Sequence, residues 1–511
     1  MTTGRRPKLC LGKRAKGNPM KKCVKERYAA GRTGGSQRDR QEIRKGKRKA
    51  ESKYTTENKM SRVLRKDGRG KKDREIQRDG SGETERRAGG NKEAERGRIF
   101  ERLAFTGRIW YNGAVNITTE KTMPYQVYLK RGEEKRILAG HSWVYANEVA
   151  KIEGKDKNGS LAEVLSFDGR YVGKGYVNHL SKILVRVFIR GNEEEGEELF
   201  CERISKAASL REKLFEGSDC YRLVFAEADD LPAFICDKYG DYFVVELLSL
   251  GMDQRRKLLV NALVKLFSPK GIYLRGDAPV RKKEGLPIEN GVLYGEVPDK
   301  ILVTENGLRM SVDVKNGQKT GYFLDQKENR YALRRYCKGA AVLDCFCNSG
   351  GFSLNAATAA REVTAVDISQ FALDNVAENA RLNGFTNVKT ECADVFTYLR
   401  AQRAAGQTYD TVVLDPPAFC KSAAEVQDAY RGYKDVNISA MKLVKRGGFL
   451  LTCSCSHYMT QPLFEKMLRE SAREAGRRVK VLEVRVQSPD HPALLAAEET
   501  SYLKAFYLQV E

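Results

Sequence analysis

The sequence predicts a multidomain protein whose last part is a doubly wound α/β domain. Short strand-like runs separated by turn residues follow residue 124, helical segments and a hairpin come next, and a regular alternation of strand and helix begins at Gly339. Strands that alternate with helices are typical of a mostly parallel sheet with helices on both faces. The four expected parts are a basic N-terminal extension over residues 1–122, a small β-barrel over 123–195, a small α+β domain over 196–315 and the α/β domain over 316–511.

The N-terminal extension carries most of the charge of the chain. Residues 1–120 hold 35 Lys and Arg but only 15 Asp and Glu, a net charge of +20 out of +24 for all 511 residues. Segments such as DGRGKKDREIQRDG bury too little apolar surface to offset the entropy of ordering, so we expect residues 1–122 to be disordered. They are either a basic arm on RNA or an extension ahead of a native start at Met123. The abrupt change to globular composition at Met123 favours the second interpretation.

Composition excludes several classes of protein. The sequence has no apolar run of 18 residues and no apolar segment at its N-terminus that would act as a secretory signal. Twelve cysteines in 511 residues are too few for a disulfide scaffold. We therefore expect reduced thiols and a cytoplasmic protein that does not enter a membrane.

The first two folded parts are predicted from short patterns. Between residues 125 and 190, the runs YQVYLK, SLAEVLSF, RYVGKGYV and KILVRVFI are separated by turn sequences, which predicts a small barrel. Residues 199–217 place their apolar side chains near one helical face, and a second helical pattern spans Leu258 to Leu266. A hairpin is expected around Tyr239 and Gly240, which completes the prediction of an α+β domain.

The strand ends of the α/β domain carry acidic residues at the positions where such sheets bind ligands. Asp344 ends the first strand, before a loop whose Gly350 lets the backbone approach a ligand, and Asp367 ends the second strand. Asp367 suits the ribose hydroxyls of an adenosine, and Asp394, after the third strand, suits the adenine amino group. Each aspartate has the alternative of a helix N-cap. Together and in this order they favour an adenosyl pocket, and the absence of GxGxxG speaks against a dinucleotide.

The fourth strand ends in the sequence Asp-Pro-Pro-Ala-Phe, which begins at Asp415. The prolines stiffen the loop, Asp415 is expected to point into the cleft, and Phe419 offers an aromatic face. The motif resembles the signature of class I S-adenosylmethionine-dependent methyltransferases that act on nucleobases. The alternative is a plain turn after a buried strand.

Two thiols lie at the carboxyl end of the fifth strand, Cys453 and Cys455 in the sequence TCSCS. A thiolate that adds to carbon 6 of a pyrimidine makes carbon 5 nucleophilic, so a cysteine here suits methylation of carbon 5. Transfer to an exocyclic nitrogen needs no thiol. The alternative for each cysteine is a small buried apolar residue. A zinc site is not expected, because the Cys-x-Cys spacings are too short and the chain has four histidines.

From Met123 onward the chain resembles the ribosomal large subunit methyltransferase I family, which makes 5-methylcytosine in 23S ribosomal RNA. The matching stretches include HSWVYANEV, NGQKTGYFLDQKENR, LDCFCNSGGFS, DPPAFCKS, RGYKDVN, LLTCSCSHYMT, DHP and YLKAF. The resemblance implies an RNA-binding PUA-like domain, a central α+β domain, a C-terminal Rossmann-like methyltransferase domain and S-adenosyl-L-methionine as cofactor. It implies 23S ribosomal RNA or a precursor of the large subunit as partner, and it leaves a homodimer open.

The resemblance also assigns roles to individual residues. It implies that Cys455 is the nucleophile and that Asp415 holds the cytosine edge, while the extra thiol of Cys453 keeps a second candidate open. It places Asp367 and Asp394 on the ribose and adenine, and Lys319, Tyr322, Asp325 and Gln326 in a segment along the cofactor. Asp344 and Gly350 join the cofactor residues from their place in the sequence pattern, and Phe419 and Lys319 are the candidates for contact with the substrate. The functions left open are an RNA methyltransferase for carbon 5 of uridine or for an exocyclic nitrogen, and a non-catalytic RNA-binding factor in ribosome assembly.

Overall fold

The computed structural model describes residues 125–155 and 157–511, so the predicted extension over residues 1–122 lies outside the described residues. The first sheet has six strands in the order β2-β6-β5-β4-β1-β3, and β1 runs parallel to β4 while the other pairs are antiparallel. Alternate side chains of these strands fill a single apolar core. The elements are β1 (Gln126–Leu129), α3 (Glu134–Leu138), β2 (Trp143–Tyr145), β3 (Val149–Glu153), β4 (Leu161–Leu165), β5 (Tyr171–Val177) and β6 (Ile183–Ile189).

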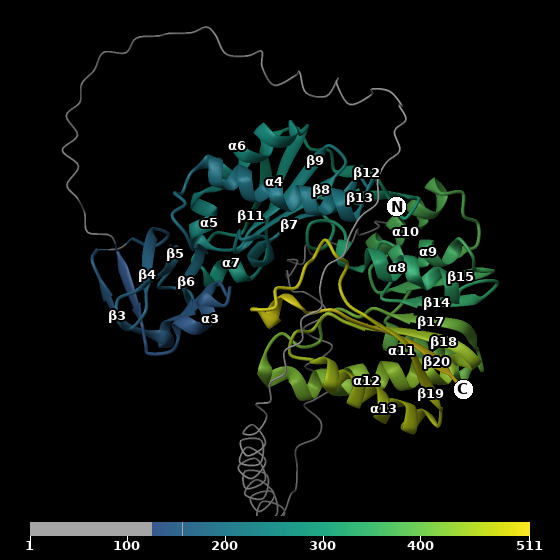
Figure 1. The fold of residues 1–511 in the computed structure, drawn as a ribbon. Helices are drawn as coiled ribbons and strands as arrows, with labels where there is room; N and C mark the ends of the chain where they lie inside the picture. The colour runs from purple at the N-terminus through teal and green to yellow at the C-terminus, as the bar shows by residue number, and fades with distance from the viewer. Residues whose placement is uncertain (1–124, 156) are drawn as a thin grey trace, which may run out of the picture. The chain divides into compact units, whose positions relative to one another are not determined.

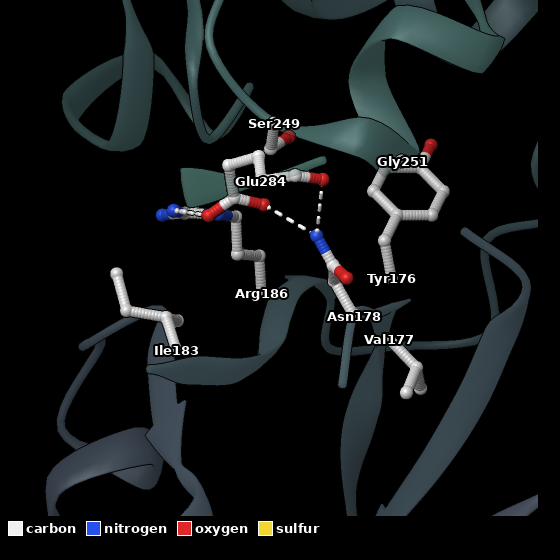
Figure 2. Close-up of a pocket in the computed structure, with 8 residues that line it drawn as sticks. All are labelled: Tyr176, Val177, Asn178, Ile183, Arg186, Ser249, Gly251 and Glu284. Atoms are coloured by element: carbon white, nitrogen blue, oxygen red, sulfur yellow. Dashed lines mark hydrogen bonds and ion pairs between the residues drawn. The ribbon is translucent and has the colours of Figure 1, made fainter. Parts of the chain in front are cut away.

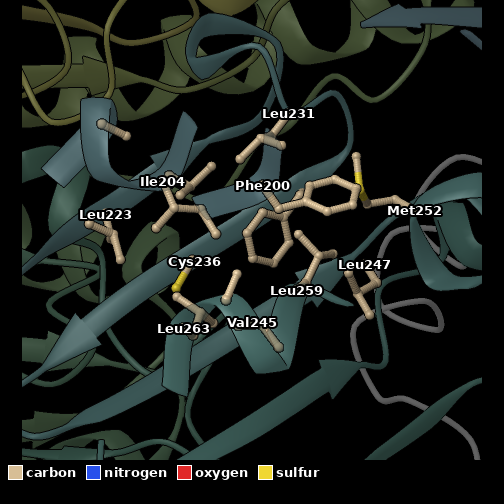
Figure 3. Packing of buried hydrophobic residues seen from close by; sticks show 14 of the residues in the cluster. Phe200, Ile204, Leu223, Leu231, Cys236, Val245, Leu247, Met252, Leu259 and Leu263 are labelled. Carbon is tan, nitrogen blue, oxygen red and sulfur yellow. The ribbon is translucent and has the colours of Figure 1, made fainter. Parts of the chain in front are cut away.

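The second sheet has five strands in the order β11-β10-β9-β8-β7 and is covered by two helices, as the sequence predicts. Side chains of α4, such as Phe200, and of α6, such as Leu259, pack against strand residues such as Val245 (Figure 3). The predicted hairpin joins β8 to β9 through Gly240, whose φ of +58° suits a glycine. The elements are α4 (Glu197–Leu214), β7 (Cys220–Phe225), β8 (Phe234–Tyr239), β9 (Tyr242–Leu247), α5 (Leu250–Gln254), α6 (Arg256–Phe267), β10 (Gly271–Gly276), α7 (Val280–Lys283) and β11 (Glu289–Gly295).

A two-stranded hairpin leads from the α+β part to the last sheet. It consists of β12 (Lys300–Glu305) and β13 (Leu308–Asp313), joined by Asn306 and Gly307 with φ values of +55° and +77°. Positive φ at both positions is the geometry of a two-residue hairpin loop whose twist matches that of the strands. Apolar side chains of the hairpin form one core with residues of β7 to β10 and of the last domain.

The last sheet has seven strands in the order β16-β15-β14-β17-β18-β20-β19, with α8, α9 and α10 on one face and α11, α12 and α13 on the other (Figure 1). All neighbours from β16 to β18 are parallel, and β20 is antiparallel to both of its neighbours. This confirms the doubly wound, mostly parallel sheet. The elements are α8 (Lys327–Leu333), β14 (Ala341–Cys345), α9 (Gly351–Ala357), β15 (Glu362–Asp367), α10 (Gln370–Leu382), β16 (Val388–Cys392), α11 (Val395–Ala404), β17 (Tyr409–Leu414), α12 (Val426–Leu443), β18 (Val444–Ser454), α13 (Gln461–Ala475), β19 (Val479–Arg485) and β20 (Lys504–Val510).

A buried polar cluster connects the first sheet to the α+β part (Figure 2). The carboxylate of Glu284 accepts hydrogen bonds from Arg186 (2.9 Å), Asn178 (2.9 Å) and Ser181 (2.6 Å). Arg186 also lies 3.6 Å from the carboxylate of Glu227. Because Glu284 is almost fully buried, its charge is compensated by these partners and not by water. The domain limits after residues 195 and 315 stay predictions. Within the described ranges, no helix combines the length and apolarity needed to cross a bilayer.

Candidate active site

The sheet order brings several predicted residues to one edge. In the chain, β14 is followed by β15 and β16 on one side, and then by β17 and β18 on the other, so the direction reverses between β14 and β17. Ligands of open α/β sheets bind at the carboxyl ends of the strands beside such a reversal. Asp344 lies in β14, Asp367 ends β15, and Asp415 and Cys455 directly follow β17 and β18.

The loop after β14 is held by the carboxylate of Asp367. One carboxylate oxygen accepts a hydrogen bond from the backbone N–H of Asn348 (3.0 Å), and the other accepts from that of Ser369 (2.9 Å). A cavity of about 190 Å³ opens beside these two bonds and is also lined by the segment from Ser311 to Gly321. Asp367 therefore fixes the two loops that would surround a ligand at this edge.

Two glycines allow the loop after β14 to enter α9. Gly350 has φ of +86°, a conformation that side-chain-bearing residues rarely adopt. A Cβ atom on Gly351 would lie 2.7 Å from Cδ of Arg330 and 2.8 Å from the hydroxyl of Tyr322. The hydroxyl of Tyr322 donates to Glu305 (3.0 Å), which also pairs with Arg330 (2.7 Å). Tyr322, assigned from the sequence to the cofactor, thus lies in a buried ion-pair cluster behind the loop.

Two buried carboxylates each keep one oxygen without a hydrogen-bond partner among the described residues. Asp344 accepts from the hydroxyl of Ser353 (2.6 Å) through Oδ2, and its Oδ1 is unsatisfied. Oδ1 of Asp325 is also unsatisfied. Burial raises the pKa of Asp344 to about 7, and the charges of nearby aspartates add to this. A cationic amino group, such as that of S-adenosylmethionine, fits an unsatisfied buried carboxylate oxygen, so these residues suit the amino-acid end of that cofactor.

The predicted adenine contact, Asp394, has a structural role as well. Its Oδ1 accepts from the backbone N–H and the hydroxyl of Thr397 (2.9 and 2.8 Å) and caps α11. Asp394 is exposed and follows β16, which is the edge strand beside β15, the strand that ends in Asp367. The N-cap alternative is therefore present, and a contact with adenine stays a prediction.

The segment after β13 places three predicted residues around Asp415. Gln326 donates to Oδ1 of Asp415 (3.0 Å), and Lys319 forms an ion pair with Asp325 (3.2 Å). The hydroxyl of Tyr502 donates to the same oxygen of Asp325 (2.6 Å). Burial alone would raise the pKa of Asp325, but the charges of Lys319 and a neighbouring histidine hold it well below the usual range.

Asp415 keeps its proton more readily than an ordinary aspartate. Burial raises its pKa to about 7, and the charge of Asp325 adds to that effect. Lys319, on the same segment as Gln326, has φ of +53°, an unusual value for a side-chain-bearing residue. Such backbone conformations persist where the surrounding contacts hold them, and they are common at functional sites.

The two candidate thiols differ in exposure. β18 ends at Ser454, so Cys453 lies within the strand, is fully buried and packs in the core with Val413 and Leu451. Cys455 lies just beyond the strand end and is partly exposed. Burial raises the pKa of Cys455 to about 11, while the charge of Lys319 opposes this rise. Burial also raises the pKa of Cys453 well above its usual value.

Phe419 belongs to an aromatic cluster at the same edge. Its ring centroid lies 4.7 Å from that of Tyr433, 6.1 Å from Phe396 and 6.4 Å from Phe346. Tyr433 is fully buried in α12, and its hydroxyl lies 3.0 Å from the hydroxyls of both Ser454 and Ser456. The cluster therefore connects the loop of Asp415 to the residues on either side of Cys455.

Sequence reasoning missed three residues of this site. Tyr433, Tyr502 and Lys504 lie in the segments RGYKDVN and YLKAF, which contributed only to the resemblance. The local sequence does not show which groups will surround such a hydroxyl or ammonium group, because its neighbours are set by the order and register of the strands. The backbone pairing of β18 with β20 is what brings Lys504 opposite Ser454.

Comparisons with known proteins match two parts of the chain to known families and most of the chain to named relatives. The PUA-like domain family matches residues 127–190, and the S-adenosylmethionine-dependent methyltransferase family matches residues 288–508. A Ribosomal RNA large subunit methyltransferase I from Vibrio cholerae is 43% identical over 392 residues, which cover 75% of this chain and 99% of the relative. A protein of the same name from Shewanella amazonensis is 42% identical over 395 residues, which cover 76% and 100%.

The chain belongs to the ribosomal RNA large subunit methyltransferase I family. It is an S-adenosylmethionine-dependent methyltransferase with a PUA-like domain, and S-adenosyl-L-methionine is its cofactor. A putative S-adenosylmethionine-dependent methyltransferase from Streptococcus mutans has a similar fold, with a TM-score of 0.65 and 21% identity over 75% of this chain and 99% of that one. A putative methyltransferase solved in complex with SAH matches with a TM-score of 0.66, 21% identity and the same coverage.

Proposed function

We propose that this methyltransferase modifies carbon 5 of a cytosine in ribosomal RNA of the large subunit, through a covalent adduct on Cys455. The observation that carries the proposal is the partly exposed thiol of Cys455 at the strand edge that also bears Asp415. Methyl transfer to an exocyclic nitrogen does not need a nucleophilic thiol. The names of the relatives, ribosomal RNA large subunit methyltransferase I, support the choice of RNA.

The thiolate of Cys455 adds to carbon 6 of the base, and electron density moves to carbon 5 and N3. S-adenosylmethionine, when bound, supplies the methyl group that carbon 5 takes up. A base then removes the proton from carbon 5, and the thiolate leaves carbon 6, which restores the aromatic ring. Addition and elimination at carbon 6 thus divide one difficult substitution into two easier steps.

Asp415 is suited to hold the base during the addition. Since its pKa is raised to about 7, a proton is available near neutral pH for donation to N3, which gains electron density as the thiolate adds. Gln326 donates to Oδ1 of Asp415 and thereby leaves Oδ2 for the base. A cytosine can also donate its amino group to the carboxyl, which supports cytosine over uridine.

Phe419 is the residue we assign to stacking on the base. Enzymes that modify a base in a stacked nucleic acid extrude it into a pocket and hold it between aromatic or apolar side chains. Phe419 is partly buried and is supported on the protein side by Tyr433. Phe419→Leu should raise the KM for RNA and leave cofactor affinity unchanged.

The reaction is tested with labelled S-adenosylmethionine and unmodified ribosomal RNA, which is then digested to nucleosides. Label in 5-methylcytidine is the expected result. Label in 5-methyluridine or in a base methylated on nitrogen would contradict the proposed site of transfer, and no label would contradict transfer to this RNA.

The nucleophile is tested with RNA that carries 5-fluorocytosine at the target. Fluorine cannot leave as a proton, so a covalent adduct should accumulate on the wild type and on Cys453→Ala, but not on Cys455→Ala. Cys455→Ala should still bind the cofactor, because the residues assigned to the cofactor lie in other segments of the chain. An adduct on Cys455→Ala that is absent from Cys453→Ala would transfer the role to Cys453.

A further inference from the structure

We propose that Lys504 is a counter-ion of the Cys455 thiolate and so increases the fraction of this cysteine that is nucleophilic at neutral pH. The inference deepens the proposed function and rests on Cys455 as its nucleophile. No sequence motif assigns Lys504 a task, and its position follows from the strand register of the last sheet.

The backbone places Lys504 directly beside the nucleophile. Lys504 begins β20, and its Cα is the cross-strand partner of Ser454 in β18. Its ammonium group donates to the carbonyl of Ser456 (2.8 Å) and to that of Tyr502 (2.7 Å). The side chain of Lys504 thus starts opposite Ser454 and ends at the carbonyl of Ser456, the two neighbours of Cys455 in the chain. Nζ is held against this turn by two hydrogen bonds, and Lys504 is only 7% exposed.

Two cations face the thiol, and they differ in their partners. Lys319 opposes the rise in the pKa of Cys455 more strongly than Lys504 does, but Lys319 also forms an ion pair of 3.2 Å with Asp325. Lys504 forms no ion pair with a carboxylate of residues 125–155 or 157–511, and both of its hydrogen bonds go to neutral carbonyls. The charged or titratable groups that face Cys455 are Lys319, Lys504, Asp325, Asp415, Tyr433, Tyr502 and Cys453.

Both partners are partly withdrawn from water, and their charged forms stabilise each other. Burial raises the pKa of Cys455 to about 11, and the charge of Lys504 is one of the influences that oppose this rise. Burial lowers the pKa of Lys504 to about 8, so this lysine still carries its charge at neutral pH. The thiolate forms when the S–H bond breaks and the proton passes to water. The freed electron pair then makes the bond to carbon 6.

The test measures the reactivity of Cys455 without methyl transfer. The full-length protein reacts with iodoacetamide between pH 6 and 7.5, where Lys504 is charged, and mass spectrometry follows alkylation of the peptide that contains Cys455. Only the thiolate reacts, so the rate at each pH reports the thiolate fraction. In Lys504→Met the rate at pH 7 should fall about tenfold, which corresponds to a rise of about one unit in the pKa of the thiol. Lys504→Arg, which keeps the charge, should return the rate towards the wild-type value.

Matched controls separate charge from packing. Lys319→Met removes the other cation that opposes the rise in the pKa of Cys455, and it should lower the rate as well. Lys504→Gln keeps a donor for the two carbonyls without the charge, and it should behave like Lys504→Met, provided cofactor affinity matches that of the wild type. An unchanged alkylation rate in Lys504→Gln would overturn the inference. So would a loss of rate in Lys504→Met that Lys504→Arg does not reverse, because the cause would then be packing.

Failure of this inference differs from failure of the proposed function. If the adduct is trapped on Cys455 but the Lys504 variants are alkylated at the wild-type rate, Cys455 stays the nucleophile and Lys504 is excluded as its counter-ion. Absence of the adduct on Cys455 would remove the nucleophile, and the counter-ion role with it.

Discussion

Glu284→Gln should weaken the connection between the first sheet and the α+β part by about 3 kcal/mol. Removing one partner of a buried ion pair leaves the other charge uncompensated, which costs about 3–5 kcal/mol. Arg186 would keep only Glu227, at 3.6 Å, so the lower end of that range applies. The amide can still accept from Asn178, which prevents a larger loss.

The assay is urea denaturation followed by the fluorescence of Trp143 in a Trp110→Phe background. Trp143 donates to Glu227 (2.7 Å) across the same boundary and therefore reports on it directly. Arg186→Met in combination with Glu284→Gln should destabilise less than the sum of the single changes, with a coupling of about 2 kcal/mol. A loss below 1 kcal/mol in Glu284→Gln, or additive single changes, would refute the assignment of this cluster as the connection.

Three further predictions concern the methyltransferase domain. Tyr433→Phe removes the hydroxyl that forms hydrogen bonds with Ser454 and Ser456. In steady-state kinetics kcat should therefore fall about tenfold, with little change in the KM for the cofactor. Tyr430→Phe, one turn earlier in α12, is the matched control and should change kcat less. The folded state binds a proton at Asp344 more tightly than the unfolded chain does, since its pKa is raised from 3.8 to about 7, so this residue makes stability fall as the pH rises from about 4 to 7. Asp344→Asn should therefore increase the free energy of unfolding more at pH 8 than at pH 5 in urea titrations, and an equal effect at both pH values would contradict the reasoning. Gly351→Ala should lower the free energy of unfolding by about 1–3 kcal/mol and weaken cofactor binding in calorimetry. The reason is that the new Cβ atom would lie under 3 Å from Arg330 and Tyr322. Unchanged stability and affinity would contradict the prediction, because the loop would then have moved to make room for the methyl group.

The sequence predicts long periodic elements better than short ones. The strand and helix patterns from Gly339 onward correspond to β14 to β20 and the helices between them, because most of these elements bury an apolar face. The two edge strands, β16 and β19, are largely exposed, and the regular alternation of strand and helix is what predicts them. In the first sheet, β2 and β3 were not expected. β2 has three residues, and four of the five residues of β3 are exposed, so neither carries a clear apolar alternation.

The site shows the same difference at the level of single residues. The acidic residues at the strand ends and the thiol after β18 could be placed from the sequence, since the end of a strand follows from its apolar pattern. The hydrogen-bond or ion-pair partner of each of these side chains could not be predicted from the sequence. Tyr322 turns to Glu305, and Asp394 caps its own helix through bonds that a sequence pattern does not distinguish from ligand contacts. Lys504 lies opposite Ser454, next to Cys455 in the chain, only through the antiparallel register of β20.

The position of β20 in the sheet has a consequence for synthesis of the protein. β20 lies between β18 and β19 in space but follows both in the chain, so β18 and β19 become neighbours of a common strand only once β20 has left the ribosome. Until then β18 exposes an unpaired edge beside the Cys455 turn, and the ammonium group of Lys504 is absent. A nascent chain that ends before Lys504 therefore lacks a finished sheet and a complete thiol environment. Completion of the sheet edge beside Cys455 is thus among the last steps of folding.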